Sequence, residues 1–93
     1  MSTKADIVWG IAIKLGVETP KMSTGSTEPR EIFEIVNDCL GLGIDARLTK
    51  QEMARKIVEA AGMPWNADYE SRGGTVTKVG LAAVLEAVEY FVA

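Results

Sequence analysis

The chain contains no histidine and only one cysteine, Cys39. Without histidine it cannot build a Ser-His-Asp or Cys-His catalytic group, or a metal site with histidine ligands. A single cysteine excludes an internal disulfide and a zinc site made of several thiolates. We therefore expect no catalytic residue, no metal ligand and no small-molecule cofactor. The low cysteine content also suits a reducing compartment such as the cytoplasm.

Long apolar runs are missing too. No stretch approaches the roughly 20 apolar residues that span a membrane. The N-terminus has no basic region followed by an apolar one, as a secretory signal has. These absences predict a cytoplasmic protein with no membrane partner. Its 93 residues, of which 47% are hydrophobic and 25% charged, are typical of a single small globular domain covering residues 1–93.

An excess of positive charge is also lacking, since ten basic residues face thirteen acidic ones and the net charge is −3. Taken alone, this balance argues against a strong nucleic-acid binder. The charges are unevenly distributed, however. Residues 28–38 carry a net charge of −3, whereas residues 45–56 carry +2. We therefore expect one acidic and one modestly basic side.

Helical periodicity of the apolar residues predicts an all-α fold. The predicted helices cover residues 3–15, 28–40, 50–61 and 78–92. A threonine stands at or just before each start, as Thr3, Thr27, Thr49 and Thr77. Residues 74–77 are the one candidate for a short extended piece. Cys39 belongs to the apolar face of the second helix, which predicts a buried thiol.

An internal repeat gives this fold its expected organisation. A shift of 46 residues places the first helix on the third, with matching apolar positions. A shift of 48 aligns Ser23–Thr27 with Ser71–Thr75, and both read S-x-G-[SG]-T. We predict two similar helix-loop-helix units, residues 3–41 and 49–92. Docked about an approximate twofold axis, they would form a four-helix domain that is roughly helix-turn-helix-like.

The two repeated loops are the first candidate sites, because each precedes a helix N-terminus. Such a terminus offers unpaired N–H groups and a partial positive charge, and glycine lets the backbone approach an anion. The residues expected to hold DNA phosphates are Lys21, Ser23, Thr24, Ser26, Ser71, Arg72, Thr75 and Lys78. The alternative is that the loops are ordinary caps and turns, for which the same residue types are typical.

The third helix is the second candidate site. Lys50, Gln51 and Arg55 lie at its expected exposed positions, and such side chains contact base edges in a major groove. The alternative is a solvated face held by pairs four residues apart, Glu52 with Lys56 and Arg55 with Glu59.

Two segments resemble a known module. They are K-M-S-T-G-S-T-E-P-R-E-I-F at residues 21–33 and M-P-W-N-A-D-Y-E-S-R-G-G-T-V-T-K-V-G-L at residues 63–81. They resemble a small helical module at the N-terminal side of some restriction endonucleases, where S-R-G-S-T-V-T precedes a helix. This chain has Gly74 in place of that serine, and it lacks the P-D…(D/E)-x-K nuclease signature. The resemblance implies a non-catalytic module of a restriction or defence-type protein that contacts double-stranded DNA.

Two other functions stay open. A helical interaction domain, such as a homodimer or part of a larger host protein, would use exposed aromatic side chains. Trp9, which lies off the apolar face of the first helix, would contact the fourth helix or a partner, and Trp65 would anchor the second loop. A small enzyme would need Asp68, Glu70 or Glu31 in a cleft.

Overall fold

The computed structural model describes residues 3–20 and 28–93. These residues form the four α helices α1 (Lys4–Leu15), α2 (Arg30–Leu40), α3 (Lys50–Ala60) and α4 (Lys78–Val92). Two short 3-10 helices, η1 (Ala67–Tyr69) and η2 (Arg72–Gly74), lie between α3 and α4. The all-α fold predicted from the sequence is therefore confirmed.

α1 and α3 begin in the same way. Thr3 and Thr49 are their N-caps, and each threonine side chain accepts a hydrogen bond from the backbone N–H three residues on. In return, the carboxylates of Asp6 and Glu52 accept the backbone N–H of these threonines. The hydrogen bonds from Thr49 hold the pKa of Glu52 below its usual value. These two capping boxes fix where both helices start.

The start of α2 differs from the prediction. The sequence places it at about Glu28 after a Thr27 cap, whereas α2 begins at Arg30 with Pro29 as its N-cap. A residue before proline is disfavoured in the helical region, which keeps Glu28 outside the helix. Thr27 itself lies outside the described residues.

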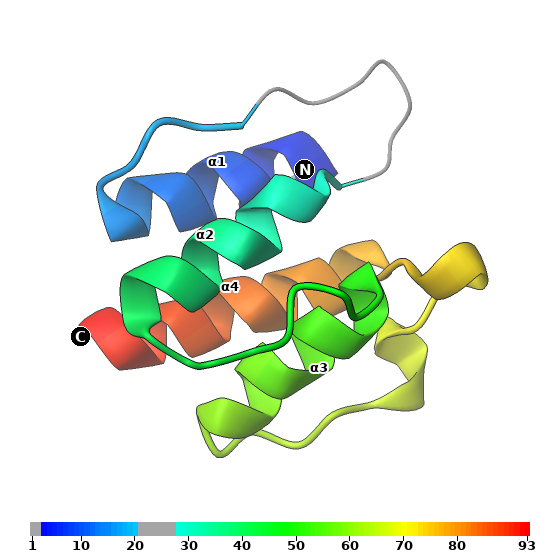
Figure 1. Cartoon of the computed structure of the whole chain (residues 1–93). Helices are drawn as coiled ribbons and strands as arrows, with labels where there is room; N and C mark the ends of the chain where they lie inside the picture. Colours follow the sequence, from blue (N-terminus) through cyan, green and yellow to red (C-terminus); the bar gives the residue numbers. More distant parts are fainter. Residues whose placement is uncertain (1–2, 21–27) are drawn as a thin grey trace.

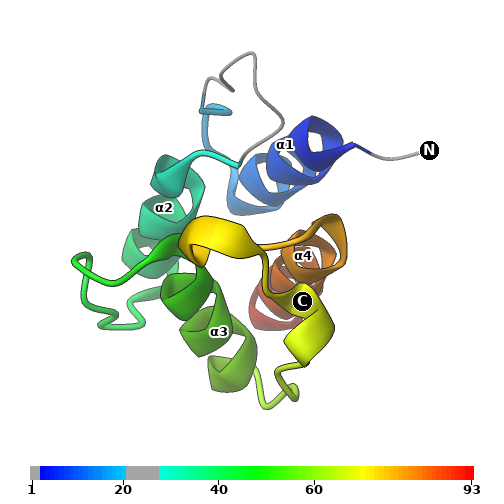
Figure 2. The ribbon, with the colours of Figure 1, turned by 90° about the vertical axis from the view of Figure 1, so that its right-hand side faces the viewer.

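All four helices start at one end of the molecule, on the right in Figure 1. We call this the helix-start end, and Figure 2 looks onto it. α1 packs beside α4 and α2 beside α3, while α3 also contacts α4. The segment that contains η1 and η2 crosses the helix-start end, in yellow in Figure 2. Because all four helices run in the same general direction, each connection returns along the bundle.

The core is built from the apolar faces of the four helices, together with Val76. Val76 also forms an isolated antiparallel bridge with Glu70. The short extended piece expected at residues 74–77 is thus confirmed for residues 75–77, whereas Gly74 belongs to η2. The prediction of a buried Cys39 is wrong, because Cys39 is exposed. An α helix turns by about 100° per residue, which leaves Cys39 at the edge of the face formed by Phe33, Val36 and Leu40.

Gly80 lies where α4 meets η1. A Cβ atom added to Gly80 would lie 2.7 Å from the carbonyl oxygen of Tyr69 and 2.8 Å from its Cβ. Gly80 is buried and its first-turn position has ordinary helical geometry. The glycine therefore permits a close approach between α4 and η1. Gly10 of α1 offers a contrast, because its added Cβ would lie 3.5 Å from Leu85, at ordinary contact distance.

Gly80→Ala should therefore lower the free energy of unfolding by about 1–3 kcal/mol, because the backbone of Tyr69 must move. Gly10→Ala is the matched control, since the same methyl group meets a flexible leucine side chain. It should be neutral or stabilising by up to about 1 kcal/mol, because alanine favours a helix. Urea unfolding of both variants measures the difference. Equal losses would contradict the close approach at Gly80.

Candidate nucleic-acid interface

A buried carboxylate, Glu28, lies at the helix-start end. Its side chain is fully buried, and both of its oxygens are bound. Oε2 accepts a hydrogen bond from Lys4 Nζ at 3.0 Å, and Oε1 accepts one from the backbone N–H of Val76 at 3.0 Å. A carboxylate buried without a partner would lower the free energy of unfolding by several kcal/mol. The two bonds to its oxygens therefore allow the fold to bury Glu28. They also join α1, the start of α2 and the segment before α4.

Two lysines bind backbone carbonyls at this end, each on the segment that precedes another helix. Lys4 Nζ donates to the carbonyl of Val76 at 2.7 Å, and Lys50 Nζ donates to the carbonyl of Glu28 at 2.7 Å. Lys4 and Lys50 are the first residues of α1 and α3, and they stand 46 residues apart. Glu28 and Val76, two residues before α2 and α4, stand 48 apart. These are the two spacings of the predicted repeat, and the residues related by them make equivalent contacts.

The segment 71–78 carries the second S-x-G-[SG]-T loop. The backbone N–H of Ser71 donates to the carbonyl of Thr75 at 3.0 Å, and Thr75 Oγ1 donates to the carbonyl of Arg72 at 2.8 Å. Thr77 Oγ1 accepts the backbone N–H of Gly80 and donates to the carbonyl of Asp68. The hydroxyls of both threonines are thus used to close the turn and to cap α4. This is the role that the alternative interpretation of the loops expects.

Gly74 explains one departure from the resembled motif. Its φ is +75°, in the left-handed region where side chains are rarely tolerated. A Cβ atom there would lie 3.0 Å from the Cβ of Thr49, the N-cap of α3. The serine of the resembled motif would therefore be strained at this position. Gly74 allows the loop to lie close to the start of α3, but it lacks the hydroxyl that a serine would have at this position.

The loop is anchored on its other side by two aromatic rings. Trp65 and Tyr69 meet edge to face with ring centroids 5.2 Å apart. Trp65 Nε1 donates to Glu70 Oε2 at 2.8 Å, so this carboxylate also holds the loop in place. Trp65 is half-buried, in the anchoring position expected from the sequence.

Arg72 and Lys78 are the cations that this segment presents to solvent. Both are exposed, as is Ser71. In the part of the chain that the structure describes, neither side chain forms an ion pair. Other cations at this end are occupied. Arg30 donates to the carbonyls of Ala46 and Leu48, and Lys4 and Lys50 hold the contacts described above.

The three residues of α3 that are candidates for base contact differ in their bonding partners. Lys50 and Gln51 are both half-buried, and Lys50 Nζ donates to the carbonyl of Glu28. Arg55 is exposed and its Nε lies 3.2 Å from Glu59 Oε2. This ion pair is the one that a solvated helix face would form. Base contact by these three residues stays a prediction.

The first loop cannot be placed beside the second. Lys21, Ser23, Thr24 and Ser26 lie outside the described residues. The phosphate contacts expected for these four residues stay a prediction, and the candidate interface consists of the 71–78 segment and the helix starts.

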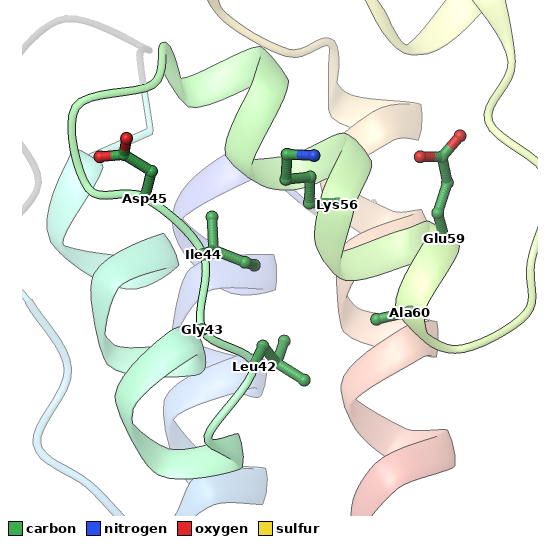
Figure 3. Close-up of a pocket in the computed structure, with 7 residues that line it drawn as sticks. All are labelled: Leu42, Gly43, Ile44, Asp45, Lys56, Glu59 and Ala60. Carbon is green, nitrogen blue, oxygen red and sulfur yellow. The ribbon is translucent and has the colours of Figure 1, made fainter.

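A cleft lies between the connection 42–45 and α3, away from Arg72 and Lys78. Its volume is about 550 Å³, and its lining residues are Leu42, Gly43, Ile44, Asp45, Lys56, Glu59 and Ala60. Figure 3 shows the carboxylates of Asp45 and Glu59 pointing away from each other. Asp45 is bound by Arg47 at 3.0 Å, and this contact holds the pKa of Asp45 below its usual value. These two acids therefore do not form a paired acid–base site.

Comparison of the chain with protein-family models, curated proteins and solved structures gives no significant match. The resemblance to the restriction-endonuclease module thus stays a prediction. Among the described helices, none is long and apolar enough to cross a membrane.

Removing the buried carboxylate tests its role in this interface. Glu28→Ala should lower the free energy of unfolding by about 3–5 kcal/mol, because it leaves Lys4 and the N–H of Val76 without their partner. Glu59→Ala is the control, since it breaks the exposed pair with Arg55 and should cost less than about 1 kcal/mol. Urea unfolding followed by circular dichroism measures both. Similar losses in the two variants would show that Glu28 does not hold the helix starts together.

Proposed function

We propose that this chain is a non-catalytic DNA-binding module that holds the phosphate backbone at its helix-start end. One observation carries the proposal. Arg72 and Lys78 are exposed and form no ion pair within the described residues, and they flank a glycine-containing turn at the end where four helices start. Helix starts carry partial positive charge, and exposed lysine and arginine side chains supply most contacts to phosphate.

Three carboxylates close to the helix starts are bound within the chain. Glu28 is paired with Lys4 at 3.0 Å, so its negative charge is compensated close by. The carboxylates of Asp6 and Glu52 act as caps on α1 and α3. Within the described residues, Arg72 and Lys78 are the unpaired cations that the 71–78 segment offers to a ligand, and the exposed carboxylates of Asp68 and Glu70 lie just before it.

Few cations are available, and this limits the mode of binding. We expect weak affinity that depends steeply on salt, because counterion release at the phosphates would supply most of the free energy. Ser71 and Thr75 would position the backbone of the turn. Because Lys50 is bound to Glu28, contacts to bases would fall to Gln51 and Arg55. From the sequence resemblance, we infer that such a module belongs to a restriction or defence-type protein.

A protein-interaction domain is the second candidate function. Large apolar side chains on α1 and α4 are exposed, among them Trp9 at 59% and Tyr90 at 66%. More than half of the Trp9 side chain is thus accessible to a partner, and contact with a partner is one of the two positions predicted for it from the sequence. Exposed aromatic side chains are typical of protein interfaces.

DNA binding is tested by neutralising one cation at a time. Lys78→Gln and Arg72→Gln should each weaken binding to a short duplex at low salt. Each should also reduce the slope of log K against log salt by about 0.9, the value for one phosphate contact. Lys14→Gln is the matched control, because it removes the same charge from the last turn of α1, at the other end of the bundle. Fluorescence anisotropy across a salt series measures these effects.

Two results would count against the proposal. One is the absence of binding by the intact chain at low salt. The other is an equal effect of Lys14→Gln and Lys78→Gln, which would indicate a response to net charge rather than to a defined surface.

A further inference from the structure

The outer face of α4 lies at the surface and carries large apolar side chains among charged ones. Val79 is 60% exposed and Tyr90 is 66% exposed, and Ala82 and Glu86 between them are exposed as well. The other faces of α4 contact α1, α3 and η1. We propose that this face binds a second copy of the same chain, with the two α4 helices antiparallel about a twofold axis.

The charges of α4 are complementary to themselves in that arrangement. Lys78 is the first residue of α4, whereas Glu86 and Glu89 lie in its second half. Lys78 and Glu89 are eleven residues apart, as are Val79 and Tyr90. Eleven residues make about three helical turns, so each pair lies along one line of the helix surface. A twofold axis between antiparallel helices places each such line next to the same line of the second copy, running in the opposite direction.

The resulting contacts join unlike charges and apolar groups. Lys78 meets Glu89 of the partner subunit, and Val79 meets Tyr90 of the partner subunit. Each contact occurs twice, because the interface is symmetric. The small side chain of Ala82 lies opposite Glu86 of the partner subunit, which leaves room for the longer side chain. A parallel arrangement would instead align the two helix dipoles unfavourably.

α1 extends this surface on one side. An apolar groove between α1 and α4 is lined by Ile7, Lys78, Val79, Ala82 and Leu85. Lys14 of α1 lies 3.6 Å from Glu89, which keeps the Glu89 carboxylate on the side of α4 that faces α1. Lys78 lines the groove on that same side. The two charged partners are therefore on matching sides of the proposed interface.

The inference does not rest on DNA binding, and it is tested without DNA. Sedimentation velocity on the full chain over a concentration series should show a reversible monomer–dimer equilibrium. Lys78→Glu and Glu89→Lys should each weaken dimerisation by more than about tenfold, because each places like charges opposite each other. The double variant K78E/E89K should restore it. An equimolar mixture of the two single variants should form more dimer than either variant alone.

These comparisons control for folding, since the restored double variant and the mixture cannot be explained by unfolded protein. Trp9→Ser is the matched control, because Trp9 is the exposed aromatic side chain of α1 and lies outside the proposed contact. It should leave the dimer unchanged. A chain that stays monomeric at all concentrations would overturn the inference. So would a dimer that both charge variants leave intact, or one that Trp9→Ser dissociates.

Discussion

The fold depends on the contacts of one buried carboxylate, that of Glu28. A carboxylate removed from water is tolerated only where its oxygens are bound, and here Lys4 and the backbone of Val76 bind them. With the bond from Lys50 to the carbonyl of Glu28, these contacts join the starts of all four helices. The segment before α4 must therefore return to this end, and the 71–78 loop lies there as a consequence.

The same constraint determines which cations are available for binding. Of the basic residues at the helix-start end, Lys4, Arg30 and Lys50 bind groups of the chain itself. Arg72 and Lys78 remain exposed. The proposed DNA contact thus depends on two cations, which is compatible with the net negative charge of the whole chain. The proposed dimer uses the outer face of α4 and pairs Lys78 with Glu89 of the partner subunit, so the dimer and DNA compete for this lysine. Because its two α4 helices are antiparallel, it would direct the two helix-start ends in opposite directions.

Local features of the fold could be predicted from the sequence, because their partners are close along the chain. The boxes formed by Thr3 with Asp6 and Thr49 with Glu52 are three residues wide, and the apolar spacing located the helices. Glu28 was different. Its partners Lys4 and Val76 are 24 and 48 residues away, so the local pattern predicts Glu28 as the first residue of a helix. The local pattern predicts an exposed Lys50 for the same reason, since its partner carbonyl lies 22 residues away.

The central claim is that the helix-start end, organised around Glu28, binds phosphate through the 71–78 segment. Amide chemical shifts of the labelled chain, recorded as a short DNA duplex is added at low salt, test it most directly. The account predicts that DNA changes the amide chemical shifts of residues 71–78 and of the first turns of the helices. Raising the salt concentration should restore the values of the free chain. Shifts confined to the C-terminal ends of the helices, or no change at all, would contradict it.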